Sequence, residues 1–119
     1  MTYQSVTILG NLGKDPDLKF TPSGQQVCSF SVATNSKYTT KDGAQVEEVV
    51  WWRVTTWGNL AETCNQYLTK GRTVLVTGRL TADENGGPRI WTGSDGTPKA
   101  SFELTALEVK FIGSKGQDD

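Results

Sequence analysis

The sequence contains no histidine, only two cysteines and no long apolar run. Histidine is the commonest general acid or base in enzymes, and the carboxylates here are scattered over turns and strand ends. With neither histidine nor a CxxC pair, a zinc site is not expected. A membrane-spanning helix would need about 20 consecutive apolar residues. We therefore expect no enzymatic activity, no metal, no cofactor and no membrane contact.

The two cysteines and the N-terminus indicate a reducing, cytoplasmic setting. Cys28 alternates with apolar residues along a strand, and Cys64 lies on the apolar side of a helical pattern. Both are expected to be buried free thiols rather than disulfide partners. Residues 1–5 lack the basic and apolar regions of a secretory signal.

The charges of the chain nearly cancel, with 12 basic and 13 acidic residues and a net charge of −1. Asp118 and Asp119 stand at the very end, and without them 12 basic residues face 11 acidic ones. For binding to nucleic acid, the distribution of charge matters more than its sum. Any basic groove must therefore arise from local clustering.

The pattern of apolar residues predicts an all-β domain, and 119 residues suffice for one domain with a real core. Five segments in which apolar residues recur at every second position, many of them β-branched or aromatic, predict five strands. The strands are expected near 5–12, 26–36, 47–57, 73–81 and 100–112. In the last strand the apolar parity changes at Ala106 and Leu107, which predicts a β-bulge.

One short helix is predicted between the third and fourth strands. Asn59 can cap its start with Glu62 at the capping-box position, and Gly71 can end it. Five strands with a helix at this point is the order of the OB-fold, a five-stranded Greek-key barrel. Long hairpin loops over 37–45 and 82–98 would project from it. We expect this domain over residues 1–112 and a flexible tail over 113–119.

The third strand carries the clearest functional pattern, because its side chains alternate between two faces. The inward set is nearly apolar and consists of Val50, Trp52, Val54 and Thr56. The outward set consists of Trp51, Arg53, Thr55 and Trp57. Rings that stack on bases, on either side of a guanidinium that pairs with phosphate, form a platform for single-stranded nucleic acid. The alternative, three core tryptophans, would bury Arg53 without a partner.

Two further pairings of ring and charge lie in the hairpin loops. Trp91 follows Arg89 by two residues, and the ring could fold onto its own barrel, pack on another subunit or stack on a base. Tyr38 stands beside Lys37, where an ordinary solvated hairpin is an equally good interpretation.

Two cations, Lys70 and Arg72, flank Gly71 at the expected end of the helix. Contact with the terminal helix carbonyls is favoured over phosphate for Lys70, and the two are balanced for Arg72. Arg79, on the outward side of the fourth strand, completes the candidates derived from the pattern.

Several stretches together resemble the bacterial-type single-stranded DNA-binding proteins, over nearly the whole chain. These stretches are VTILGNLGKDP at 6–16, VATN at 32–35, WWRV at 51–54, WGNLAE at 57–62, YLTKG at 67–71 and GRL at 78–80. The resemblance implies an OB-fold homotetramer that binds single-stranded DNA without strong sequence preference in replication, recombination and repair. Alternatives are an OB-fold accessory subunit, or a module that grips a sugar or a protein with the same aromatic face.

Individual roles follow from the same resemblance. The base-stacking positions match Tyr38, Trp51, Trp57 and Trp91, and basic positions near the DNA match Lys19, Arg53, Lys70 and Arg89. Trp52 matches a position near the subunit interface. The chain departs from the family at Asp83 and Glu84, where relatives tend to be basic, and at Asn59, often a lysine. The family's long linker and acidic tip, which recruits replication and repair proteins, are missing from this sequence.

Overall fold

A computed structural model describes residues 1–113 of the chain, as eight strands and one helix. The expected tail falls, apart from Gly113, outside the described residues. The strands are β1 (Val6–Leu12), β2 (Asp17–Phe20), β3 (Gln26–Thr39), β4 (Gln45–Trp57), β5 (Thr73–Leu80), β6 (Ile90–Thr92), β7 (Pro98–Ala100) and β8 (Phe102–Ile112). The helix, α1 (Gly58–Tyr67), lies between β4 and β5.

Five of the strands close into a barrel. The sheet runs in the order β1-β5-β8-β4-β3-β2, and an additional pairing of β1 with β3 closes five of these strands into the barrel. β4 and β8 run parallel, whereas the other pairs are antiparallel. The short β2 extends β3 as a sixth strand, and β6 and β7 form a separate hairpin. This closed five-stranded barrel with one helix confirms the OB-fold expected from the sequence.

The barrel core is filled by the inward side chains of the strands and by one face of the helix. Val32, Val54, Val74, Val76 and Leu104 are fully buried. Ala61 and Cys64 add the helix to this core. Cys28 and Cys64 are free and buried, as predicted, and burial raises the pKa of the Cys64 thiol to about 12.

Glycine at Gly78 lets β5 and β8 approach closely. A Cβ added there would lie 2.1 Å from the carbonyl oxygen of Thr105. The predicted bulge lies at this point, because Thr77 pairs with Glu108 while Gly78 pairs with Ala106. Leu107 is thus the extra residue, and the parity change read from the sequence is confirmed.

The ends of the helix correct the sequence-based prediction. Helix α1 begins directly after β4, with Trp57 as its N-cap and no side-chain cap hydrogen bond. Asn59 is therefore not the cap, because Gly58, at a φ of +65°, already makes the turn from strand to helix. The helix ends at Tyr67, before Gly71, whose N–H instead donates to the carbonyl of Leu12 at 2.8 Å.

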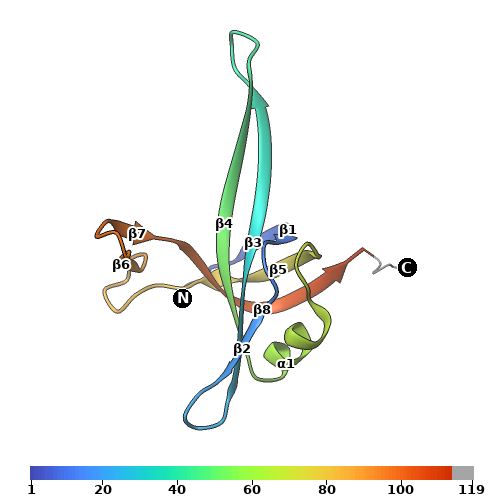
Figure 1. Cartoon of the computed structure of the whole chain (residues 1–119), viewed down its shortest axis with the longest axis vertical. Helices are drawn as coiled ribbons and strands as arrows, with labels where there is room; N and C mark the ends of the chain where they lie inside the picture. Colours follow the sequence, from blue (N-terminus) through green and yellow to red (C-terminus); the bar gives the residue numbers. More distant parts are fainter. Residues whose placement is uncertain (114–119) are drawn as a thin grey trace.

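Two hairpins leave the barrel in different directions (Figure 1). The longer one continues β3 and β4 as a two-stranded ribbon to a turn over residues 40–44. The other is the segment between β5 and β8, which carries β6 and β7 and is called the arm below. Both expected hairpins are thus present, but strand pairing extends to Thr39 and Gln45, so the first loop covers 40–44 rather than the expected 37–45.

Candidate nucleic-acid interface

The outward face of β4 holds the aromatic platform that the sequence predicts. Trp51 and Trp57 are 53% and 44% exposed, whereas Val54 and Thr56 on the inward face are fully buried. Arg53 is exposed between the two rings. Opposite Arg53 and Thr55, strand β3 carries only the small side chains of its serines. The alternation of the two faces is confirmed, and the guanidinium of Arg53 remains accessible.

Trp51 rests on a glycine at the end of β1. A Cβ added at Gly13 would lie 2.6 and 2.8 Å from Cζ3 and Cη2 of the Trp51 ring. The N–H of Gly13 donates to the carbonyl of Ser31 at 3.1 Å, which fixes the glycine against β3. The Cζ3–Cη2 edge of the indole therefore abuts this glycine, which limits how far the ring can move although half of it is exposed.

Trp52 occupies the opposite face from the platform. It is half-buried, its Nε1 donates to Oγ1 of Thr34 at 3.1 Å, and its ring centroid is 5.5 Å from that of Phe102. Phe102 itself is largely exposed. This pair forms an apolar surface beside the barrel rather than part of the platform.

Tyr38 and Lys37 stand far out on the β3–β4 ribbon. Tyr38 pairs with Val46 and is 53% exposed, and Lys37 pairs with Glu47 across the strands. Because Ala33 is the partner of Trp51, the pleat places Lys37 on the face of Trp51 and Tyr38 on the other face. The ribbon does not bring Tyr38 together with the platform.

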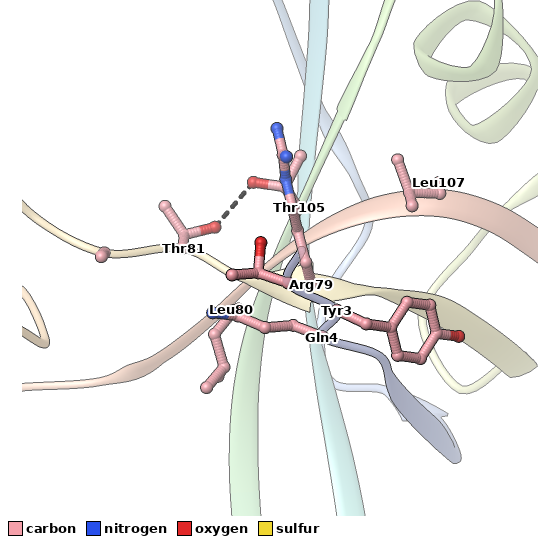
Figure 2. Close-up of a pocket in the computed structure, with 9 residues that line it drawn as sticks. Tyr3, Gln4, Arg79, Leu80, Thr81, Thr105 and Leu107 are labelled. Atoms are coloured by element: carbon pink, nitrogen blue, oxygen red, sulfur yellow. Dashed lines mark hydrogen bonds between the residues drawn. The ribbon is translucent and has the colours of Figure 1, made fainter. Parts of the chain in front are cut away.

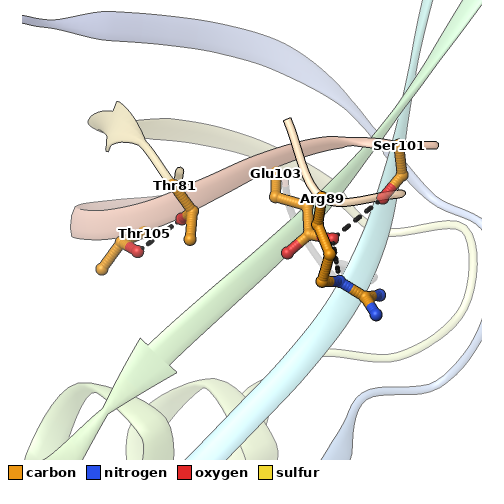
Figure 3. A network of polar contacts seen from close by, with 5 residues as sticks. All are labelled: Thr81, Arg89, Ser101, Glu103 and Thr105. Carbon is orange, nitrogen blue, oxygen red and sulfur yellow. Dashed lines mark hydrogen bonds and ion pairs between the residues drawn. The ribbon is translucent and has the colours of Figure 1, made fainter. Parts of the chain in front are cut away.

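The arm places Arg89 against Trp91 and also against Glu103 of β8, and Figure 3 shows the second of these contacts. The guanidinium carbon of Arg89 lies 4.6 Å from the centroid of the Trp91 ring. Nε of Arg89 donates to Oε2 of Glu103 at 2.8 Å, and Oγ of Ser101 donates to the same oxygen at 3.1 Å. Arg89 and Trp91 share a face of the arm, as expected, but Arg89 already has a carboxylate partner.

The remaining candidate cations differ in their surroundings. Lys19, on β2, is exposed with Nζ 3.6 Å from Oδ2 of Asp17. Lys70 is exposed, and only its backbone N–H is engaged, with Oδ1 of Asp15 at 2.8 Å. Lys70 was the stronger candidate for the helix C-terminus, but among residues 1–113 its ammonium makes no hydrogen bond with the terminal helix carbonyls.

Arg72 takes the contact that was favoured for Lys70. Its Nη1 donates to the carbonyl of Tyr67, the last helical residue, at 3.1 Å, and its guanidinium carbon lies 5.8 Å from the Phe111 ring centroid. Arg72 is half-buried, so its charge mainly stabilises the end of the helix.

Arg79 borders a shallow depression of about 700 Å³ at the end of β5 (Figure 2). Tyr3, Leu80 and Leu107 line the same depression, and Oγ1 of Thr81 and Oγ1 of Thr105 are 2.7 Å apart beside it. Arg79 is exposed, and the polar side chains of Thr2, Gln4 and Thr105 line the same depression.

Both hairpin tips carry a carboxylate that stays ionised. The hydroxyl of Thr40 donates to Asp42 and lowers the pKa of that carboxyl. Thr97 does the same for Asp95 in the arm, at 2.7 Å. Because an anion repels phosphate, the tips are unfavourable places for a nucleic acid backbone.

Within residues 1–113, no cluster of three or more acidic, cysteine or histidine side chains is arranged to hold a metal ion. The helix of this part of the chain is too short to cross a membrane.

The model of the single-strand binding protein family matches residues 3–112. The chain belongs to this family. A single-stranded DNA-binding protein of Neisseria meningitidis serogroup A is 34% identical over 118 residues, which are 99% of this chain and 64% of that protein. The protein of the same name from Xanthomonas axonopodis pv. citri is 38% identical over 94% of this chain and 59% of its own length. The chain thus spans about two thirds or less of these relatives.

A solved structure has the same fold. The Plasmodium falciparum SSB in its complex with single-stranded DNA superimposes with a TM-score of 0.77 at 25% identity, over 94% of this chain and 97% of that one.

Two residues of the candidate site in the present chain could not be identified from its sequence. They are Gly13, which supports Trp51, and Glu103, which holds Arg89. Glu103 is a charged residue at an outward position of a largely apolar strand. This was the only feature of the sequence that could have pointed to its role.

Proposed function

We propose that this chain binds single-stranded DNA without strong sequence preference, by base stacking on its tryptophans and by phosphate contacts of nearby cations. The observation that carries the proposal is the outward face of β4, where two exposed indoles flank an accessible Arg53. The names of the relatives and the DNA complex of a protein with the same fold support it. No step of this function requires bond chemistry, so we do not expect catalysis.

Stacking suits binding that ignores sequence, because every base offers a flat π-face. Each stacked base typically contributes ~1–3 kcal/mol. Trp51 and Trp57 are the first candidates, and Trp91 extends the path onto the arm. Tyr38 is a further candidate, on the other face of the ribbon. Lys19, Lys37, Arg53, Lys70 and Arg79 are the cations that we expect to lie near phosphates.

We further propose that the chain works as a homotetramer. Large apolar side chains that a lone barrel leaves exposed support assembly, since patches of this kind commonly mark protein interfaces. Tyr3, Leu80 and Leu107 surround one depression, and Trp52 with Phe102 forms a second apolar surface. In the assembly, other copies of the chain would cover these surfaces. We expect the assembly to act in replication, recombination and repair in the cytoplasm.

Tryptophan fluorescence tests the proposal directly. Titration with oligo(dT) should quench the emission strongly, and a duplex of the same length should quench it far less. Trp51→Ala and Trp57→Ala should each weaken binding by roughly five- to a hundredfold, if one stacked base is lost. Unchanged emission with oligo(dT) would refute DNA binding and would favour a sugar- or protein-binding module. Light scattering on the same sample tests the tetramer.

A further inference from the structure

We propose that Arg89 is a positioning residue that holds Trp91 with one ring face open to a base, and that it does not contact phosphate. This inference deepens the proposed DNA binding and rests on it. It changes the role that the sequence suggests for Arg89. The contacts of the arm with β8 carry it (Figure 3).

The ion pair of Arg89 ties the arm to the barrel. Glu103 is only 13% exposed, whereas the Arg89 side chain is 51% exposed. The carboxylate sits on β8, a strand of the closed barrel, and Ser101 binds the same oxygen. The carbonyl of Glu103 also accepts the N–H of Thr81, where the arm begins, at 2.9 Å. Glu103 thus fixes both the start of the arm and its guanidinium.

The guanidinium in turn occupies one face of the Trp91 ring. At 4.6 Å from the ring centroid, it is within the range of a cation–π contact. A base cannot stack on a face that a guanidinium already covers. The far face of the indole is then the one available to DNA, and its orientation depends on Arg89 and Glu103.

The same ion pair influences Arg53. Arg53 and Glu103 are register partners in the parallel pair of β4 and β8. Among residues 1–113, Glu103 is paired with Arg89 and not with Arg53. Arg89 therefore neutralises a carboxylate beside the platform, and the charge of Arg53 remains available.

Glu103→Gln and Arg89→Lys separate the two possible roles of Arg89. If Arg89 positions Trp91, Glu103→Gln loosens the guanidinium and weakens oligo(dT) binding by roughly three- to tenfold, part of the value of one stacked base. Arg89→Lys weakens binding similarly, because an ammonium is not planar, does not stack on the indole and lacks the forked donors of a guanidinium. If Arg89 contacts phosphate, Glu103→Gln removes a repelling charge and tightens binding, and Arg89→Lys keeps wild-type affinity.

Glu84→Gln is the matched control, because it removes the same charge from an exposed position of the same arm. It should leave affinity unchanged or raise it slightly. In a Trp91→Ala background, Glu103→Gln should have no further effect, which a general loss of stability would not produce. Tighter or unchanged binding by Glu103→Gln, or full affinity of Arg89→Lys, overturns the inference. Absence of binding by the wild-type chain would instead overturn the proposed function.

Discussion

Replacing Gly13 with alanine should displace Trp51 without unfolding the barrel. The new Cβ would lie 2.6 and 2.8 Å from two carbons at the ring edge, and a rigid ring cannot bend away as a flexible chain can. Since carbon atoms prefer about 3.5–4.0 Å, the ring must withdraw by roughly 1 Å. The change needs no unusual backbone conformation, because Gly13 is not among the glycines with positive φ.

This shift is expected to cost part of one stacking interaction. If half of a contribution of ~1–3 kcal/mol is lost, oligo(dT) binding weakens by roughly three- to tenfold. The free energy of unfolding should change by less than about 1 kcal/mol, since the ring is half exposed and the core is untouched. Fluorescence titration gives the affinity, and urea denaturation gives the stability.

Two comparisons make the result specific to Trp51. Gly87→Ala is the matched control, because a Cβ there meets nothing within 4 Å and its φ is not positive. In a Trp51→Ala background, Gly13→Ala should have little further effect on binding. Full affinity and full quenching in Gly13→Ala would show that Gly13 does not hold the ring, and the reasoning would fail.

Three other perturbations probe the core, the assembly and the thiols. Gly78→Ala should lower the free energy of unfolding by at least roughly 2 kcal/mol, because the backbone carbonyl of Thr105 cannot yield, and an unchanged urea midpoint would contradict this. Trp52→Ala should shift light scattering towards smaller species while the lone barrel keeps its platform. An intact oligomer would show that Trp52 does not support assembly. The pKa of Cys64 is about 12 when folded against an ordinary 9.0, so the unfolded chain releases its proton first and stability should fall as pH rises from about 9 towards 10. Cys64→Ala should reduce this slope, and equal slopes would refute the assignment.

The barrel and the platform could be predicted from the sequence because both follow from a local period of two. Alternation along β4 separates Trp51 and Arg53 from Trp52 and Val54 without reference to the rest of the chain. The bulge at Leu107 could be found in the same way, since one extra residue reverses the apolar parity. Predictions from this pattern are reliable because one face of each strand must be buried in the core, which fixes the register of the strand.

The misplaced ends of the helix show where local signals fail. Asn59 and Glu62 fit a capping box, but β4 runs straight into the helix through Gly58, so the chain has already turned before Asn59. Likewise Gly71 serves the contact with Leu12 and not the end of the helix. In both cases tertiary packing decides which residue makes the turn.

The support of the aromatic rings could not be predicted, because it depends on segments that are distant in sequence. Gly13 meets Trp51 only once β1 closes the barrel against β3. Arg89 meets Glu103 only because the arm folds back onto β8. Sequence spacing places each ring on a face, but the neighbour that orients the ring comes from the closed fold.

The contacts of the cations also bear on how the chain would bind DNA. Arg72 contacts the end of the helix and Arg89 contacts Glu103 beside the arm, so both guanidinium groups already have partners within the protein. Lys19 has Asp17 beside it, and both hairpin tips carry ionised carboxylates. A cation that already has a counter-charge releases few ions when DNA arrives, and each free phosphate contact steepens the salt dependence by only about 0.7 in log–log slope. In a chain of net charge −1, affinity should therefore depend more on its tryptophans than on salt.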